Sequence, residues 1–334
     1  MRNIEPLSTP HARNWQLELT DAITSVDELL QVLELEHLEC TPVHDSSFRL
    51  LVPRAFVGKM RKRDPTDPLL RQVLPLESEN CASGVLDPVG DLAAMTTPGV
   101  LHKYKGRALL VMTGACPIHC RYCFRRHFPY SDSNPGKQEW KPVLDYLSDN
   151  REIQEVILSG GDPLMLGNAR LERLLRTLET VPHIKWLRIH SRMPVVLPSR
   201  IDHGLITLLQ KLRFRTTLVT HANHANELAN EEFEVLERLG SCGITLLNQS
   251  VLLRGVNDSA AALAALSRKL FEAGVLPYYL HMLDPVKGAL HFDVARDRAV
   301  ALLESVRTEL PGYLVPRLVR EIPGEPSKTA IFTI

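Results

Sequence analysis

From about residue 106 onward, short apolar runs rich in β-branched residues alternate with segments of helical periodicity. Five of the runs start about 30 residues apart, which is the size of a βα unit. Such alternation predicts a parallel sheet covered by helices. Because six units are too few for an eight-unit barrel, we expect an α/β fold of the partial (βα)6, TIM-like barrel type rather than an open doubly wound sheet. The runs span 108–112, 155–158, 186–190, 216–220, 244–247 and 277–283.

The segments between the runs have helical spacing and end near glycines. Leu228, Val235, Leu236 and Leu239 share one face before Gly240. A second face, formed by Leu263, Leu266, Leu270 and Phe271, comes before Gly274. Glycine is common where helices end. Both folds considered above place functional residues at the carboxyl ends of the strands.

Residues 1–100 differ from this pattern and are predicted to form a helical N-terminal region with irregular connections. Ser25 and Asp27 come before an apolar face at 29–35 and could cap a helix. The proline-containing turns at 64–68 and 87–88 interrupt the region. The 334-residue chain is long enough to bury a core without disulfides.

The charge balance and hydropathy exclude several classes of protein. With 39 basic and 39 acidic residues the net charge is zero, which argues against a nucleic-acid binder that depends on phosphate attraction. No apolar run reaches the roughly 18–20 residues of a membrane helix. The first residues lack the features of a signal peptide. We therefore expect a cytoplasmic protein whose thiols stay reduced.

Three of the six cysteines are clustered directly after the first predicted strand. Cys116, Cys120 and Cys123 fall within eight residues. Three thiolates on one loop can bind three irons of a [4Fe–4S] cluster and leave the fourth iron free. A zinc site completed by His119 or His127 is the rival interpretation. The other cysteines stand alone and are interpreted as buried thiols: Cys40, Cys81 and Cys242.

A glycine pair follows the second predicted strand. Gly160 and Gly161 come before Asp162 and Pro163. Two glycines allow the backbone to approach a ligand closely. Taken alone, the motif also fits an ordinary tight turn.

Together, the two motifs resemble the radical S-adenosylmethionine superfamily. The cysteine loop has the spacing of that superfamily, with Tyr122 just before the last cysteine. The resemblance implies a partial (βα)6 barrel in which the free iron of the [4Fe–4S] cluster binds S-adenosylmethionine. It also implies that this cofactor contacts a set of strand-end residues, namely Tyr122, Gly160, Gly161, Asp162, Ser191 and Gln249.

Longer matches resemble one family within that superfamily, the lysine 2,3-aminomutases. The segments 125–130 and 321–329 resemble the branch that makes (R)-β-lysine for elongation factor P. The resemblance implies an isomerase that moves the amino group of L-lysine from C2 to C3. It also implies a functional link to elongation factor P and its β-lysine ligase, and an electron donor of the flavodoxin or ferredoxin type. The family matches lie at 101–107, 123–126, 190–196, 220–224 and 248–258.

The family uses pyridoxal 5′-phosphate as a further cofactor, carried by a lysine near the C-terminus. Lys328 matches that lysine, and Lys287 lies outside the matching segment. The resemblance implies that Lys103, Tyr104 and Arg107 hold the ring and phosphate of this cofactor. The expected organisation is therefore an N-terminal region at 1–100, a radical core barrel at 101–300 and a C-terminal segment at 301–334 that carries the lysine.

Three further positions match the residues that bind substrate in the family. Arg125 corresponds to the residue that pairs with the substrate carboxylate, a task for which its planar fork is suited. Asp284 and Glu321 correspond to two acidic positions around the far amino group. Two carboxylates would favour a charged ammonium and reject neutral or acidic side chains.

Two alternatives remain open from the sequence. The chain could be a lysine 2,3-aminomutase of catabolism or osmolyte synthesis, without a link to elongation factor P. It could also be a zinc-stabilised binding module. We interpret His221, His224 and Glu227 as residues of the pocket rather than as a metal triad. Since relatives bind zinc through C-terminal cysteines that are lacking here, we expect no zinc; whether the chain forms a homo-oligomer stays open.

Overall fold

The computed structural model describes residues 14–38, 48–80, 83–133 and 140–332. Cys40 and Cys81 lie outside the described residues. Cys242 is half-buried and packs against the main hydrophobic core. Within the described residues, no helix is long and apolar enough to cross a membrane.

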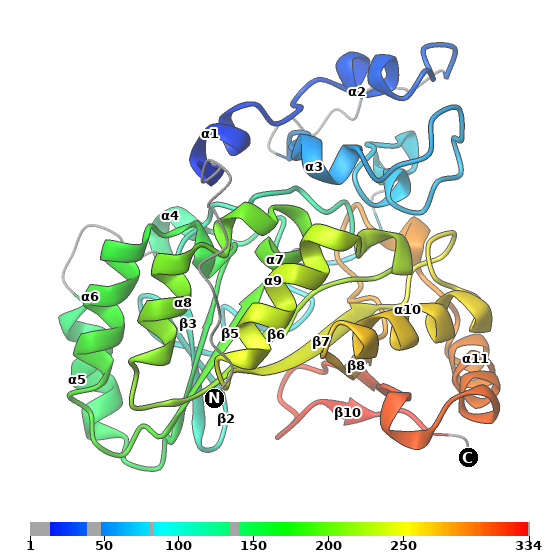
Figure 1. The fold of residues 1–334 in the computed structure, drawn as a ribbon. Coiled ribbons are helices and arrows are strands. Elements are labelled where there is room, and N and C mark those ends of the chain that lie inside the picture. Colours follow the sequence, from blue (N-terminus) through cyan, green and yellow to red (C-terminus); the bar gives the residue numbers. More distant parts are fainter. Residues whose placement is uncertain (1–13, 39–47, 81–82, 134–139, 333–334) are drawn as a thin grey trace.

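A single curved sheet forms the centre of the fold (Figure 1). Neighbouring strands follow one another in sequence order, and β3 to β9 are all parallel. The six predicted strands are confirmed as β3 to β8. The sheet is extended by β9, a seventh parallel strand, and by antiparallel strands at both edges. The strands are β1 (Met95–Thr97), β2 (Val100–Tyr104), β3 (Arg107–Val111), β4 (Glu155–Ser159), β5 (Trp186–Ser191), β6 (Arg215–Thr220), β7 (Thr245–Val251), β8 (Leu276–His281), β9 (Arg317–Arg320) and β10 (Thr329–Ala330).

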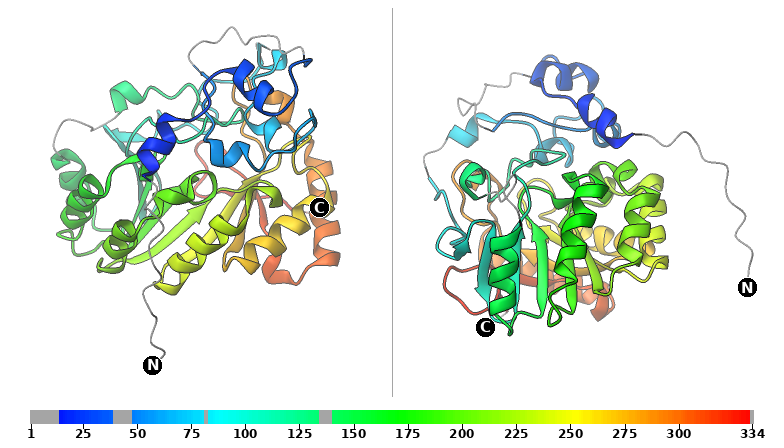
Figure 2. Two further views of the ribbon diagram at one scale, coloured as in Figure 1. Left: turned by 45° about the horizontal axis from the view of Figure 1, so that its top comes forward. Right: turned by 90° about the vertical axis from the view of Figure 1, so that its left-hand side faces the viewer.

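Helices connect the parallel strands and cover one face of the sheet (Figures 1 and 2). The longer ones are α5 (Lys141–Asp149), α6 (Asn168–Leu178), α8 (His203–Gln210), α9 (Asn230–Ser241), α10 (Ala260–Glu272) and α11 (Arg296–Glu309). Short helical turns complete the connections: α4 (Tyr130–Ser133), η3 (Pro163–Met165), α7 (Met193–Val196), η4 (Pro198–Arg200), η5 (Ala225–Glu227), η6 (Leu290–Phe292) and η7 (Gly312–Leu314).

Two of the helix expectations needed correction. The helix expected to stop at Gly240 continues to Ser241, and Gly243 takes the left-handed backbone conformation with a φ of 77°. The helix before Gly274 ends as expected, because Gly274 has a φ of 74°. Phe271, however, is 44% exposed and does not belong to the buried face.

The two faces of the sheet have different chemical character because side chains alternate along a strand. One set packs against the helices and forms the main core: Ala108, Leu110, Val156, Leu158, Leu187 and Ile189. The other set lines a cavity: Arg107, Leu109, Ile157, Ser159, Arg188, His190, Gln249, Val251, Tyr279 and His281. The inner face of the partial barrel is thus polar enough to hold a ligand.

The N-terminal region lies across the end of the barrel where the parallel strands finish (Figure 2). Its described helices are α1 (Trp15–Thr20), α2 (Val26–Val32), α3 (Arg54–Val57), η1 (Leu70–Gln72) and η2 (Glu77–Asn80). The Ser25 side chain caps α2 by accepting a hydrogen bond from the N–H of Glu28. The region contacts the cysteine loop directly, since the N–H groups of His119 and Arg121 donate to the carbonyls of Leu51 and Gln72.

Candidate active site

One cavity gathers the residues predicted to bind a cofactor or the substrate. Of the three residues expected to shape the pocket, His221 lines this cavity, whereas His224 and Glu227 do not. The cavity is lined by the inner face of the sheet, by the cysteine loop after β3 and by the connection between β9 and β10. All sixteen candidate residues lie around it: Lys103, Tyr104, Arg107, Cys116, Cys120, Tyr122, Cys123, Arg125, Gly160, Gly161, Asp162, Ser191, Gln249, Asp284, Glu321 and Lys328. The carboxyl ends of parallel strands meet at one edge, which explains why segments so far apart in sequence converge.

The glycine pair supports the start of the cysteine loop. The N–H of Gly161 donates to the carbonyl of Thr113, and the N–H of Asp162 donates to that of Ala115. A Cβ on Gly160 would lie 2.7 Å from the Thr113 oxygen, and one on Gly161 would lie 2.3 Å from the Ala115 oxygen. The close approach that we expected toward a ligand is therefore made here by the protein backbone itself.

The three clustered thiols are free and half-buried along the same cavity. Burial raises the pKa of the Cys116 thiol, and burial together with Cys120 raises the pKa of the Cys123 thiol to about 11. Thiols whose pKa is raised ionise readily only beside positive charge, which bound iron would supply. The donor set therefore fits an iron–sulfur cluster.

The histidines that could complete a zinc site are turned to other partners. The Nδ1 atom of His119 lies 2.6 Å from the carbonyl of Arg49, and its ring stacks on Phe48. The Nε2 atom of His127 lies 3.1 Å from the carbonyl of Lys287. Neither histidine is therefore positioned as a fourth zinc ligand beside the three cysteines.

Asp162 and Ser191 join the ends of β4 and β5. The Asp162 carboxylate accepts from the Ser191 hydroxyl at 2.9 Å, from the N–H of Arg192 at 2.7 Å and from the N–H of Leu164 at 2.9 Å. Both residues are buried. Their side chains bond to one another, so their predicted contact with S-adenosylmethionine stays a prediction.

The other end of the cavity is formed by the hairpin between β9 and β10. Thr329 pairs with Arg320, which places Glu321 and Lys328 across from each other at the base of the loop. The Lys328 Nζ atom donates to the Glu321 carboxylate at 2.5 Å. Although burial opposes ionisation, Lys328 and Lys103 lower the pKa of Glu321. The hairpin thus explains why two residues seven positions apart act on one site.

A chain of alternating charges links this hairpin to Arg125. Lys103 donates to Glu321 at 2.8 Å and lies 2.5 Å from Asp91, while the Arg125 Nε atom donates to Asp91 at 2.7 Å. Arg125 also donates to the Ser159 hydroxyl. Asp91 is 2% exposed and was not predicted from sequence, because it lies in the turn-rich N-terminal region away from every strand end.

Asp284 presents an unsatisfied carboxylate to the cavity. Its Oδ1 atom is buried and has no hydrogen-bond partner among the described residues. Burial and the nearby charge of Glu321 raise the pKa of Asp284 to about 7. The Nε2 atoms of His190 and His281 are buried and unpartnered in the same cavity. Unsatisfied buried polar atoms around a cavity indicate a polar ligand.

Tyr104 and Arg107 lie together on the cavity wall. The Arg107 guanidinium stacks over the Tyr104 ring, 4.6 Å from its centroid. No carboxylate among the described residues pairs with Arg107. Lys103 differs, since its ammonium already donates to the Val89 carbonyl and contacts both Asp91 and Glu321. Of the two cations expected at a phosphate, Arg107 is the one without an ionic partner.

Comparison with known proteins assigns the family. The family model of the radical SAM superfamily matches residues 110–266. L-lysine 2,3-aminomutase of Escherichia coli (strain K12) is 48% identical over 99% of this chain and 98% of its own length. The chain belongs to the L-lysine 2,3-aminomutase family. The enzyme of that name from Haemophilus influenzae is 46% identical over 95% of both chains, and that from Clostridium subterminale is 34% identical over 95% of this chain and 77% of its own.

Family membership makes the chain a radical SAM isomerase and implies three cofactors: a [4Fe–4S] cluster, S-adenosylmethionine and pyridoxal phosphate. This corrects the alternative of a non-catalytic zinc module. The structure offers a fitting environment at each end of the cavity. Three free thiols lie at one end, and a lysine with an unpaired arginine lies at the other.

Proposed function

We propose that this chain converts L-lysine into (R)-β-lysine by moving the amino group from C2 to C3. The observation that carries the proposal is the grouping of Asp284, Glu321 and Lys328 in a cavity that the three free cysteines also line. The near-full-length similarity to relatives named L-lysine 2,3-aminomutase supports the same substrate. The three thiols would hold the cluster, and Lys328 would hold pyridoxal phosphate.

The acidic pair would select the far ammonium of lysine. Glu321 is ionised, and Asp284 has a buried oxygen that lacks a partner. An ammonium that enters between them would donate to both carboxylates and favour the ionised form of Asp284. A neutral or acidic substrate side chain would leave the buried Asp284 carboxyl without a partner. The acidic pair would therefore select lysine both by attracting its ammonium and by the free-energy cost that other side chains incur.

Arg125 would hold the other end of the substrate. Its Nε and Nη1 atoms are fixed by Asp91 and Ser159, while no described residue accepts a hydrogen bond from Nη2. A guanidinium locked on one side and open on the other can bind a carboxylate in a single orientation. Fixing both ends of the substrate would place the carbon atoms between them with little freedom.

When bound, the cofactors would supply two groups. One is a carbon radical that takes a hydrogen atom, and the other is a carbonyl group that carries the migrating amine. The residues of this chain do the positioning. Lys328 presents its Nζ atom to the cavity from the base of the hairpin. Arg107 would bind the phosphate, and Lys103 would keep Glu321 turned toward the substrate. We keep Tyr122, Gly160, Gly161, Asp162, Ser191 and Gln249 as the proposed neighbours of S-adenosylmethionine.

We further propose that the product serves modification of elongation factor P through its β-lysine ligase in the cytoplasm. The similarity of 125–130 and 321–329 to that branch of the family supports this role. A flavodoxin or ferredoxin would supply the electron. A deletion strain tests the link. We expect elongation factor P to lose its β-lysyl group, and added β-lysine to restore it; unchanged modification would favour a catabolic or osmolyte role.

The reaction itself is tested with anaerobically purified protein, loaded with iron, sulfide and pyridoxal phosphate. We expect L-lysine, S-adenosylmethionine and dithionite to yield β-lysine, whose enantiomer is resolved by chiral chromatography. Formation of the S enantiomer would refute the stereochemical assignment. Absence of β-lysine from protein with a full iron complement would refute lysine as the substrate.

A further inference from the structure

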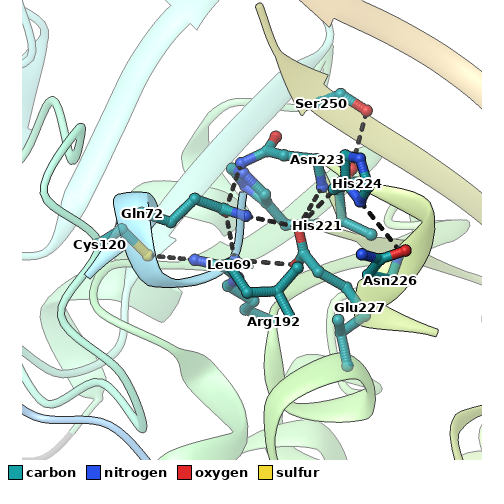
Figure 3. A network of polar contacts seen from close by, with 12 residues as sticks. Leu69, Gln72, Cys120, Arg192, His221, Asn223, His224, Asn226, Glu227 and Ser250 are labelled. Carbon is teal, nitrogen blue, oxygen red and sulfur yellow. Dashed lines mark hydrogen bonds and ion pairs between the residues drawn. The ribbon is translucent and has the colours of Figure 1, made fainter. Parts of the chain in front are cut away.

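Arg192 connects a predicted cluster ligand to a buried carboxylate. It follows β5 directly, and only 6% of its surface is exposed. Its Nη1 atom donates to the Cys120 Sγ atom at 2.7 Å, and its Nη2 atom donates to Glu227 at 2.9 Å (Figure 3). Among the described residues, no other lysine or arginine side chain donates a hydrogen bond to any of the three thiols.

Glu227 is the counter-ion of Arg192. Its side chain is fully buried and accepts from Gln72 at 3.0 Å and from the N–H groups of Asn223 and His224. Although burial opposes ionisation, Arg192 lowers the pKa of Glu227. Arg192 therefore bonds to the Cys120 sulfur through one terminal nitrogen and to the Glu227 carboxylate through the other.

The remaining contacts fix the orientation of this pair. The Gln72 Oε1 atom accepts from Arg192 at 2.8 Å and from the Asn223 side chain at 3.0 Å. The same Asn223 amide donates to the Tyr122 hydroxyl at 2.7 Å. Figure 3 shows that the members come from the N-terminal region, the cysteine loop and two strand ends. Both terminal nitrogens of Arg192 are therefore bonded, and its buried Nε atom is the one guanidinium nitrogen without a partner among the described residues. These bonds hold the guanidinium against Cys120.

We propose that Arg192 is a positioning residue that makes the cluster easier to reduce, and that Glu227 limits this effect. An oxidised cluster held here would accept one electron from a low-potential donor and would gain one negative charge. Hydrogen bonds to cluster sulfur and nearby positive charge both stabilise the reduced form. The inference rests on the cluster implied by the family but not on lysine as the substrate.

The test is a potentiometric titration of the reconstituted cluster, followed by the paramagnetic resonance signal of its reduced form, without lysine. We expect Arg192→Gln to move the midpoint potential to a more negative value by at least a tenfold change in the reduction equilibrium, about 59 mV for one electron. We expect Glu227→Gln to move it in the opposite direction. A general loss of structure would not produce shifts of opposite sign.

Arg200→Gln is the matched control, because Arg200 is also buried in the same connection but donates to the carbonyls of Leu164 and Leu166. We expect its potential to equal that of the wild type. An unchanged potential in Arg192→Gln with full iron content would overturn the proposal. If that variant fails to hold iron, Glu227→Gln decides alone: a more positive potential supports the proposal, and an unchanged one overturns it.

Discussion

The two ends of the cavity are constructed in different ways. Behind the cysteine loop at the cluster end, Glu79 bonds to Arg121 and Arg126; these three side chains are at most 1% exposed and do not line the cavity itself. At the lysine end, the side chains of Lys103, Glu321 and Lys328 are 15–20% exposed. The lysine end also has the buried, unpartnered oxygen of Asp284. One end is fixed by the protein alone, whereas the other has charged groups that can change partners when a ligand arrives.

This difference separates the expected consequences of mutation. A buried ion pair that loses one partner leaves an uncompensated charge and destabilises the fold. A partly exposed charge that faces a cavity is screened by water, and its loss mainly affects what binds there. Changes at the cluster end should therefore act on folding and iron content. Changes at the lysine end should act on cofactor attachment and substrate binding.

The largest effect is expected for Lys328→Ala, which removes the proposed attachment point of pyridoxal phosphate. We expect turnover to vanish, together with the visible absorbance of the lysine-bound cofactor, while iron content stays at the wild-type level. Lys287→Ala is the control, because this exposed lysine does not line the cavity. Full turnover with bound pyridoxal phosphate in Lys328→Ala would show that another residue carries the cofactor.

Next in size is Glu79→Gln, at the cluster end. The change leaves Arg121 and Arg126 without their shared carboxylate, and we expect a loss of about 3–5 kcal/mol in the free energy of unfolding. Chemical denaturation of the anaerobic protein measures it. Glu77→Gln, in the same helical turn but exposed, should change stability very little. Equal stability of the two variants would mean that the buried pair contributes nothing to the fold.

Most of the barrel was predictable because its signals are local. Apolar runs at the spacing of βα units gave β3 to β8, and Gly274 marked the end of α10. By contrast, β9 was missed because Arg317–Arg320 is short and carries an arginine at each end. Its pairing with β8 depends on contacts that no local pattern encodes.

Site residues were predictable where a motif or a family match marked them. Residues that belong to the site only through a long-range contact were not. The cysteine loop and Lys328 were predicted in the first way. Asp91 was not predicted, and the bond from Arg192 to Glu227 was not, since an acidic residue acquires its role only through the arginine that the fold brings to it. The register of the hairpin that pairs Glu321 with Lys328 also lies beyond sequence spacing.

Asp284→Asn tests the lysine end without disturbing the hairpin. Removal of one partner of a buried charge pair costs about 2–5 kcal/mol, which is about a thirtyfold to several-thousandfold loss in kcat/KM for lysine. We expect unfolding and iron content to stay unchanged. Asp297→Asn, on the exposed side of α11, is the control. If Asp284→Asn lost as much unfolding free energy as Glu79→Gln, the two ends of the cavity would not differ in their effect on folding.

The smallest effect is a pH dependence that belongs to the lysine end alone. Because burial and Glu321 raise the pKa of Asp284 to about 7, its carboxyl is protonated below that pH and cannot pair with an ammonium. The pKa of Glu321 is lowered, so it stays ionised throughout, and the lysine ammonium stays charged up to about pH 10. We therefore expect kcat/KM for lysine to rise about tenfold per pH unit up to pH 7 and then to level off. The rising limb should persist in Asp297→Asn and disappear from the residual activity of Asp284→Asn. If the rise of kcat/KM below pH 7 were the same in both variants, a group other than Asp284 would cause it.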